Sequence, residues 1–197
     1  EADVTTVTSE GMLFCECKSK IITLNSIKGL TESIKTDVYQ AIGAAYSQAV
    51  RSIERVQAGK KFVTNSGDEI VIENSSSKFI VCVTAENFGI IPSEIDEYIE
   101  IDEDFGIPYV VNIYDLDIIT QECESYNEFI QYIEFRKKNY AILSTLDELD
   151  AFGYFKKNGN TSISVDGDEL FLTNFTAEFD EKYKAKDKQV FQEFFKA

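Results

Sequence analysis

The chain has 197 residues, of which 44% are hydrophobic and 27% are charged, so it can bury the core of one large domain. A net charge of −16 argues against a protein that simply coats nucleic acid. The absence of histidine excludes mechanisms built on an imidazole base. No apolar run approaches the roughly 18 residues of a membrane span and no signal peptide is recognisable, so we expect a cytoplasmic protein without a membrane partner.

The charge is distributed unevenly along the chain. Residues 1–62 contain 8 Lys and Arg against 7 Asp and Glu, a net charge of +1, whereas the remainder contains 11 against 28, a net charge of −17. This asymmetry leaves a phosphate-binding face possible in the first third only.

Two strands are predicted at residues 3–8 and 12–18, joined as a hairpin by the turn at 9–11. Because the first residues already have a strand pattern, we expect the chain to begin inside a domain. A long helix is predicted over 31–58, with Thr31 as its N-cap and Gly59 as its stop. Its apolar residues recur at helical spacing: Ile34, Val38, Ala41, Ile42, Ala45, Ala49, Ile53 and Val56.

The rest of the chain alternates shorter elements. The predicted elements are a hairpin over 61–73, a strand over 78–86 buried on both faces, a strand running into a turn or helix over 108–119, helices over 125–138 and 145–157, a hairpin over 162–173 and a helix over 177–197. This order predicts an α/β or α+β fold with a mixed central sheet and the long helix on one face.

Four cysteines are present: Cys15, Cys17, Cys82 and Cys123. They form no CxxC pair, and without histidine they argue against a structural zinc site. We expect all four to be small, buried, apolar side chains in a reducing compartment.

The strand over 12–18 carries two charges within an apolar run. Alternate residues of a strand share a face, so Glu16 and Lys18 project together, opposite Cys15 and Cys17. The hairpin turn brings Asp3 alongside this pair. Two carboxylates and a lysine are therefore predicted to converge at one end of the hairpin.

Two converging carboxylates are suited to Mg²⁺ or Mn²⁺, which take oxygen ligands. Asp3 and Glu16 would supply carboxylates, and the backbone carbonyl of Cys17 could be a further ligand. Such an ion lowers the pKa of a bound water and neutralises charge on a phosphate. Lys18 could orient the attacking water and stabilise the transition state.

Asp3, the Glu16-x-Lys18 pair and Gln48 in the following helix together resemble the PD-(D/E)xK nuclease superfamily, over roughly residues 1–86. The resemblance implies a restriction-endonuclease-like core at residues 1–90 without its N-terminal elements, and an acidic strand and helix extension at 91–197 packed on the same domain. It implies Asp3 and Glu16 as metal ligands, Lys18 as the catalytic lysine and Gln48 as a site-organising residue. Ala2 stands where the family has proline.

The activity implied by this resemblance is metal-dependent hydrolysis of phosphodiester bonds, in DNA more than in RNA. Arg51 and Arg55 lie three and seven residues after Gln48, on the same predicted helix face, where they would contact nucleic acid or simply be solvated. Asp115 and Asp117 follow a predicted strand, where a carboxylate can also be a ligand.

Other interpretations of the sequence stay open. The chain could be a nuclease-like module without activity that binds a protein partner. It could also be a different α/β fold that acts as an acidic interaction protein, such as a nucleic-acid mimic. Homodimerisation, sequence preference and endo- or exonuclease action are not determined by these patterns. Seven acidic residues between 94 and 104 lack the spacing of a Ca²⁺-binding loop and are expected to form a solvated face.

Overall fold

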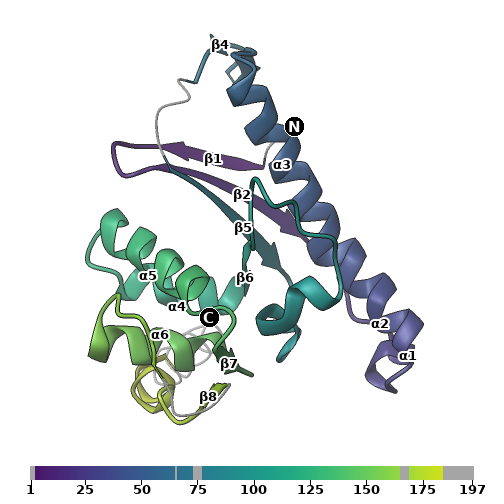
Figure 1. The fold of residues 1–197 in the computed structure, drawn as a ribbon, viewed down its shortest axis with the longest axis vertical. Coiled ribbons are helices and arrows are strands. Elements are labelled where there is room, and N and C mark those ends of the chain that lie inside the picture. Colours follow the sequence, from purple (N-terminus) through teal and green to yellow (C-terminus); the bar gives the residue numbers. More distant parts are fainter. Residues whose placement is uncertain (1–2, 65, 73–76, 165–168, 184–197) are drawn as a thin grey trace, which may run out of the picture.

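A four-stranded mixed sheet forms the centre of the computed structural model, which describes residues 3–64, 66–72, 77–164 and 169–183 (Figure 1). Its strands are β1 (Val4–Val7), β2 (Met12–Lys18), β5 (Lys78–Thr84) and β6 (Tyr109–Asn112), in the order β1-β2-β5-β6. β1 is antiparallel to β2, whereas β2, β5 and β6 are parallel. The predicted mixed α/β class and the first hairpin are confirmed.

One face of the sheet is covered by a long helical segment (Figure 1). It follows the short helix α1 (Leu24–Ile27) and consists of α2 (Thr31–Val38), η1 (Tyr39–Gly43) and α3 (Ala44–Gln57). The predicted apolar seam is buried from Val38 onward, because its side chains pack on Met12 and Phe14 of β2.

The predicted C-terminal end of this helical segment is confirmed, whereas its predicted N-cap is wrong. Thr31 is not the N-cap, because the backbone is already helical there and the extended residue before it is Leu30, which makes no side-chain capping bond. The C-terminal end is as predicted, since the helix ends at Gln57 and Gly59 follows with a φ of +61°.

The segment η1 is a π-helical turn within this long helix. Such a turn accommodates one extra residue and offsets the faces of the helices on either side. Gly43 closes the turn, where an added Cβ would lie 2.8 Å from Cδ2 of Tyr39 and 3.1 Å from Cγ2 of Ile99. The spacing of the apolar seam is compatible with a regular α-helix and with this π-helical turn. The sequence therefore predicted a regular α-helix and gave no sign of the turn.

The opposite face of the sheet carries α4 (Ile113–Glu122), α5 (Tyr126–Lys138) and α6 (Glu148–Asn158) (Figure 1). Their N-caps Asn112, Ser125 and Asp147 each accept a hydrogen bond from the first turn. Aromatic rings fill this second core around Tyr132, which is fully buried and makes an edge-on contact with Phe152 and a tilted contact with Phe155. Covering both faces explains why β5 is almost entirely apolar, as predicted.

The remaining short elements lie at the edges of this arrangement. They are the β3–β4 hairpin (Phe62–Val63 and Glu69–Ile70), the 3₁₀ segment η2 (Ile91–Glu97), and the parallel pair β7 (Leu143–Thr145) and β8 (Leu170–Leu172). The hairpin predicted over 61–73 is confirmed in β3 and β4.

The hairpin predicted over 162–173 is wrong where the structure describes it. Leu170–Leu172 pairs in parallel with β7 instead of folding back on residues 162–164, because β7 offers an open strand edge beside α6. The predicted turn at Asp166-Gly167 lies outside the described residues. The predicted C-terminal helix begins at residue 177 and is described to residue 183.

The predicted boundary near residue 90 falls between β5 and η2. β6 follows that boundary in the sequence and pairs with β5, so residues on both sides contribute to one sheet. Within the described ranges, no helix has both the length and the apolar character needed to cross a bilayer.

Candidate active site

The first hairpin places Asp3 directly across from Glu16. Val4 is paired with Cys15, and one step further along the antiparallel register is Asp3 opposite Glu16. The backbone N–H of Asp3 donates to Oε2 of Glu16 at 3.4 Å, and the N–H of Cys17 donates to Oδ2 of Asp3 at 2.8 Å. The Asp3 carboxylate is therefore held beside the end of β2 by the backbone of that strand.

Lys18 is the last residue of β2 and shares a face of the sheet with Glu16. Its Nζ donates a 2.9 Å hydrogen bond to Oε1 of Gln48 and lies 3.9 Å from Oδ2 of Asp3. Gln48 projects from α3, which packs over this face of β2. The structure thus brings Asp3, Glu16, Lys18 and Gln48 together from three elements.

Glu16 is 0% exposed although it is a carboxylic acid. Burial is the main cause that raises the pKa of Glu16 to about 7, and the charge of Asp3 raises it further, while Lys18 acts in the opposite direction. Among the described residues, Oε1 of Glu16 has no hydrogen-bond partner. Burying a carboxylate oxygen without a partner is costly, so this atom is poised to accept a cation.

These residues fit a hard divalent ion such as Mg²⁺ or Mn²⁺. The orphaned oxygen of Glu16 and the Asp3 carboxylate provide two anionic oxygens, and such an ion retains several waters. The described residues contain no group of three or more Cys, Asp or Glu side chains that could hold a metal ion. Further ligands at this position would have to be water or backbone carbonyls, for which Cys17 is the predicted source.

The cysteine prediction is partly wrong. The Cys17 side chain is exposed, because it lies near the end of β2 beyond the part that the helices cover. Cys82 is buried, whereas Cys15 and Cys123 are half-buried against the core around Tyr132. None of the four forms a disulfide.

The two arginines predicted to contact nucleic acid, Arg51 and Arg55, are both exposed on α3. Arg51 is exposed and lines a groove between α3 and residues 99–102, on the side of Tyr46. Arg55 donates from Nη2 to the carbonyl of Lys61 at 3.0 Å, and its guanidinium lies 5.6 Å from the centre of the Phe62 ring. Gln48 thus contacts Lys18 of β2, whereas Arg51 and Arg55 are exposed on α3.

A buried aspartate that the sequence analysis did not single out anchors the segment after β2. Asp37 of α2 accepts hydrogen bonds from the N–H of Thr23 at 2.7 Å and from the Ser26 hydroxyl at 2.6 Å, and pairs with Lys20 at 3.0 Å. These contacts, led by the Ser26 bond, hold the pKa of Asp37 well below its usual range. They tie the residues that follow Lys18 to the helical layer carrying Gln48.

The carboxylates at the end of β6 form a separate group. Asp115 accepts a 2.6 Å hydrogen bond from the Asn112 amide, and burial together with the nearby Asp147 raises the pKa of Asp115 to about 7. Asp117 is exposed on α4 and accepts from Gln121. Asp115 is therefore accounted for by its capping contact with Asn112.

Comparisons with protein-family models, curated proteins and solved structures gave no significant match to this chain. The arrangement of Asp3, Glu16, Lys18 and Gln48 is accordingly the basis for the function proposed next.

Proposed function

We propose that the chain is a nuclease that hydrolyses phosphodiester bonds of DNA, and less readily RNA, with water activated by Mg²⁺ or Mn²⁺. The observation that carries the proposal is the fully buried Glu16 carboxyl, which interacts electrostatically with Asp3 and Lys18 and has one oxygen without a partner among the described residues. Burial of a carboxyl and a strongly shifted pKa, next to a second carboxylate and an amine, are typical of catalytic sites.

In this proposal, the Asp3 and Glu16 carboxylates and the Cys17 carbonyl would hold the ion. The ion, when bound, would supply a water of lowered pKa and positive charge against the phosphate oxygens. Lys18 has three N–H donors, one of which is used by Gln48, so the others can face the attacking water and the developing phosphorane charge. Gln48 would fix the direction of the ammonium.

The arrangement of elements supports assignment to the PD-(D/E)xK superfamily. A hairpin carries Asp3, Glu16 and Lys18, the long helix that follows carries Gln48, and β5 pairs in parallel with β2. These features support the core that the sequence resemblance implied. We therefore propose a restriction-endonuclease-like fold for residues 1–90.

DNA would approach from the near-neutral part of the molecule, because residues after 62 carry a net charge of −17. We propose that exposed Arg51 and Arg55 contact phosphates outside the scissile group. Such contacts set affinity without conferring sequence preference. A cytoplasmic location and a second subunit or protein partner are further parts of this proposal.

The test is cleavage of supercoiled plasmid and of single-stranded oligonucleotides with Mg²⁺ or Mn²⁺, and with EDTA as the blank. We expect Glu16→Gln and Lys18→Met each to lower the cleavage rate at least about 100-fold, since each removes a group acting on the reacting phosphate. Lys61→Gln is the matched control for Lys18, because Lys61 forms an exposed pair with Glu69. Lack of metal-dependent cleavage, or cleavage unchanged by both site variants, would contradict the proposal.

A second function is favoured by the charge distribution. The exposed residues Asp96, Glu97, Glu100, Glu103 and Asp104 extend from η2 onto the segment that packs against α3. Such a surface would suit an acidic protein-interaction module that occupies a DNA-binding protein. This function predicts no heat of Mn²⁺ binding in calorimetry and displacement of DNA from a basic partner, whereas the nuclease predicts Mn²⁺ binding that Glu16→Gln removes.

A further inference from the structure

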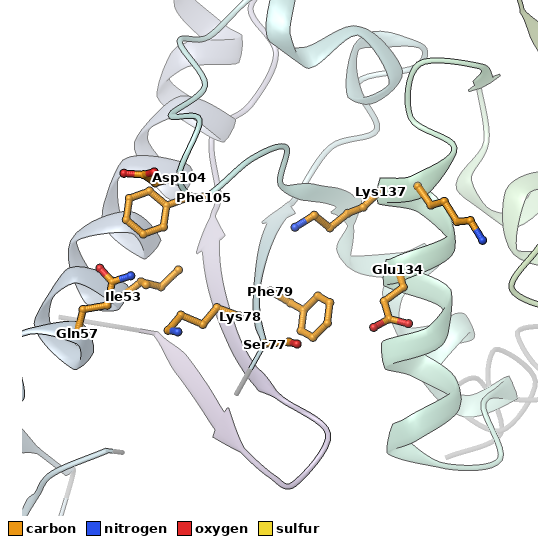
Figure 2. Close-up of a pocket in the computed structure, with 10 residues that line it drawn as sticks. Ile53, Gln57, Ser77, Lys78, Phe79, Asp104, Phe105, Glu134 and Lys137 are labelled. Atoms are coloured by element: carbon orange, nitrogen blue, oxygen red, sulfur yellow. The ribbon is translucent and has the colours of Figure 1, made fainter. Parts of the chain in front are cut away.

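A cleft of about 650 Å³ lies between α3 and α5, at the start of β5 (Figure 2). Lys78 at this end pairs with Met12, whereas Lys18 pairs with Thr84 at the other end of the same strands. The cleft is therefore separated from the Asp3–Glu16 group by the length of β2. Its volume is within the range of small-molecule sites.

Lys137 is the unusual residue of this cleft. Its side chain is half-buried and its ammonium lies 5.9 Å from the centre of the Phe79 ring. Burial lowers the pKa of Lys137, while the charge of Glu134 acts in the opposite direction; no carboxylate in the described part of the chain lies within 4.0 Å of its Nζ. The ammonium has thus lost hydration without gaining an ion pair, and a bound anion would compensate for that loss.

Lys78 supplies a second ammonium to the same cleft. Figure 2 shows Lys78 extending from β5 toward α3 and Lys137 extending from α5 toward β5, on the side of the Phe79 ring, so the two ammonium groups approach the start of β5 from its two faces. With Lys138, the lining has three positive charges against the two of Asp104 and Glu134. A local excess of positive charge in a chain of net charge −16 favours an anionic ligand.

The α3 side of the cleft is apolar and aromatic. Phe105 is half-buried, and its ring lies beside Ile53 in Figure 2, with Asp104 next to it and Gln57 one turn along α3. A partly exposed ring can stack on a planar group. Asp104 can accept hydrogen bonds from N–H groups of such a ligand, and the Gln57 amide can both donate and accept.

We propose that this cleft binds a nucleoside monophosphate, with its phosphate at the start of β5, between Lys78 and Lys137, and its base against Phe105 and Ile53 on the α3 side. A phosphate dianion matches two ammonium groups, and a nucleobase presents both the planar face and the edge N–H groups that the other wall accommodates. The proposal is independent of the nuclease function, because it uses no residue of the Asp3–Glu16 group.

Isothermal titration of the full chain with each of the four nucleoside 5′-monophosphates, in EDTA, tests the proposal. We expect saturable binding, weakened about tenfold by Lys137→Met and by Lys78→Gln, because each removes one charged contact to the phosphate. Phe105→Ala should also weaken it. Lys61→Gln is the charge-matched control outside the cleft, and Glu16→Gln should bind as the parent does, which separates this site from nuclease activity.

Two comparison ligands decide whether both parts of the ligand are recognised. Inorganic phosphate and the unphosphorylated nucleosides should each bind at least about tenfold more weakly than the monophosphate. Equal binding of either one, no saturable heat, or binding unchanged in both lysine variants would overturn the proposal. If Lys137→Met fails to melt cooperatively, Lys78→Gln and Phe105→Ala decide the outcome by the same measurement.

Discussion

Glu16 occupies a buried position of β2, although its side chain is a carboxylic acid. It lies two residues after Phe14 on the same face of β2, yet its carboxyl is as buried as that ring. Side-chain alternation in a strand determined which face Glu16 occupies. Its pKa of about 7 results from burial and from Asp3, neither of which is a property of residue 16 alone.

This burial predicts that Glu16→Gln stabilises the protein at alkaline pH. The pKa of Glu16 is about 7 in the folded state, against 4.5 for an unperturbed glutamate, so the folded state binds more protons between these pH values. The free energy of unfolding therefore decreases as pH rises through this window and stays lower above it. We expect Glu16→Gln to raise the free energy of unfolding at pH 8 by on the order of 2 kcal/mol, with little effect near pH 4.

Urea denaturation at both pH values measures this difference. Glu54→Gln is the matched control, because Glu54 is exposed on α3 and should change stability by less than about 0.5 kcal/mol at either pH. A Glu16→Gln protein that is no more stable than its parent at pH 8 would show that the buried carboxylate is already neutralised within the fold.

At the scale of elements, the pairing of β8 with β7 is the feature that local patterns did not predict. Leu170–Leu172 has the alternation of a hairpin strand, but its partner is Leu143–Thr145, reached across α6. The connection is secured at α6, where Oδ1 of Asp150 accepts hydrogen bonds from the N–H groups of Phe175 and Thr176. The chain crosses α6 so closely that the helix has a glycine, Gly153, at that point.

Gly153→Ala is therefore predicted to destabilise the protein although alanine favours helices. An added Cβ would lie 2.7 Å from the carbonyl oxygen of Phe175 and 2.9 Å from its Cβ, so backbone must move. We expect a loss of about 1–3 kcal/mol in chemical denaturation, as for other overpacked sites. Asn158→Ala, on the exposed end of α6, is the control, and equal stability of the two variants would contradict the predicted close approach.

At the scale of the whole molecule, charge is the dominant property. A net charge of −16 and an isoelectric point of about 4.4 produce self-repulsion in the folded state at neutral pH. The described ion pairs are few, and the Lys61–Glu69 pair is exposed on both sides, so they offset little of this repulsion. Counter-ions should therefore stabilise the folded state of this protein more than that of a neutral protein of the same size.

We expect the melting temperature at pH 7.5 to rise by about 2–4 °C between about 0.02 M and about 0.3 M NaCl, because salt screens the repulsion. The measurement is a thermal melt followed by circular dichroism. The same series near pH 4.4 is the control, since the net charge there is close to zero and the rise should disappear. A melting temperature that falls with salt at pH 7.5 would mean that attractive pairs outweigh the repulsion.

Local sequence patterns determined the features that depend on neighbours in the chain. The two-residue period of β2 set Glu16 and Lys18 on one face, the helical seam predicted the helix that ends before Gly59, and the continuous apolar run predicted β5 as an interior strand. Tertiary structure alone decided the burial of Glu16, the contact between Lys18 and Gln48, the β7–β8 pairing and the cleft beside Lys137. The physical reason is that desolvation and close contact depend on residues far apart in the chain, about which a local pattern carries no information.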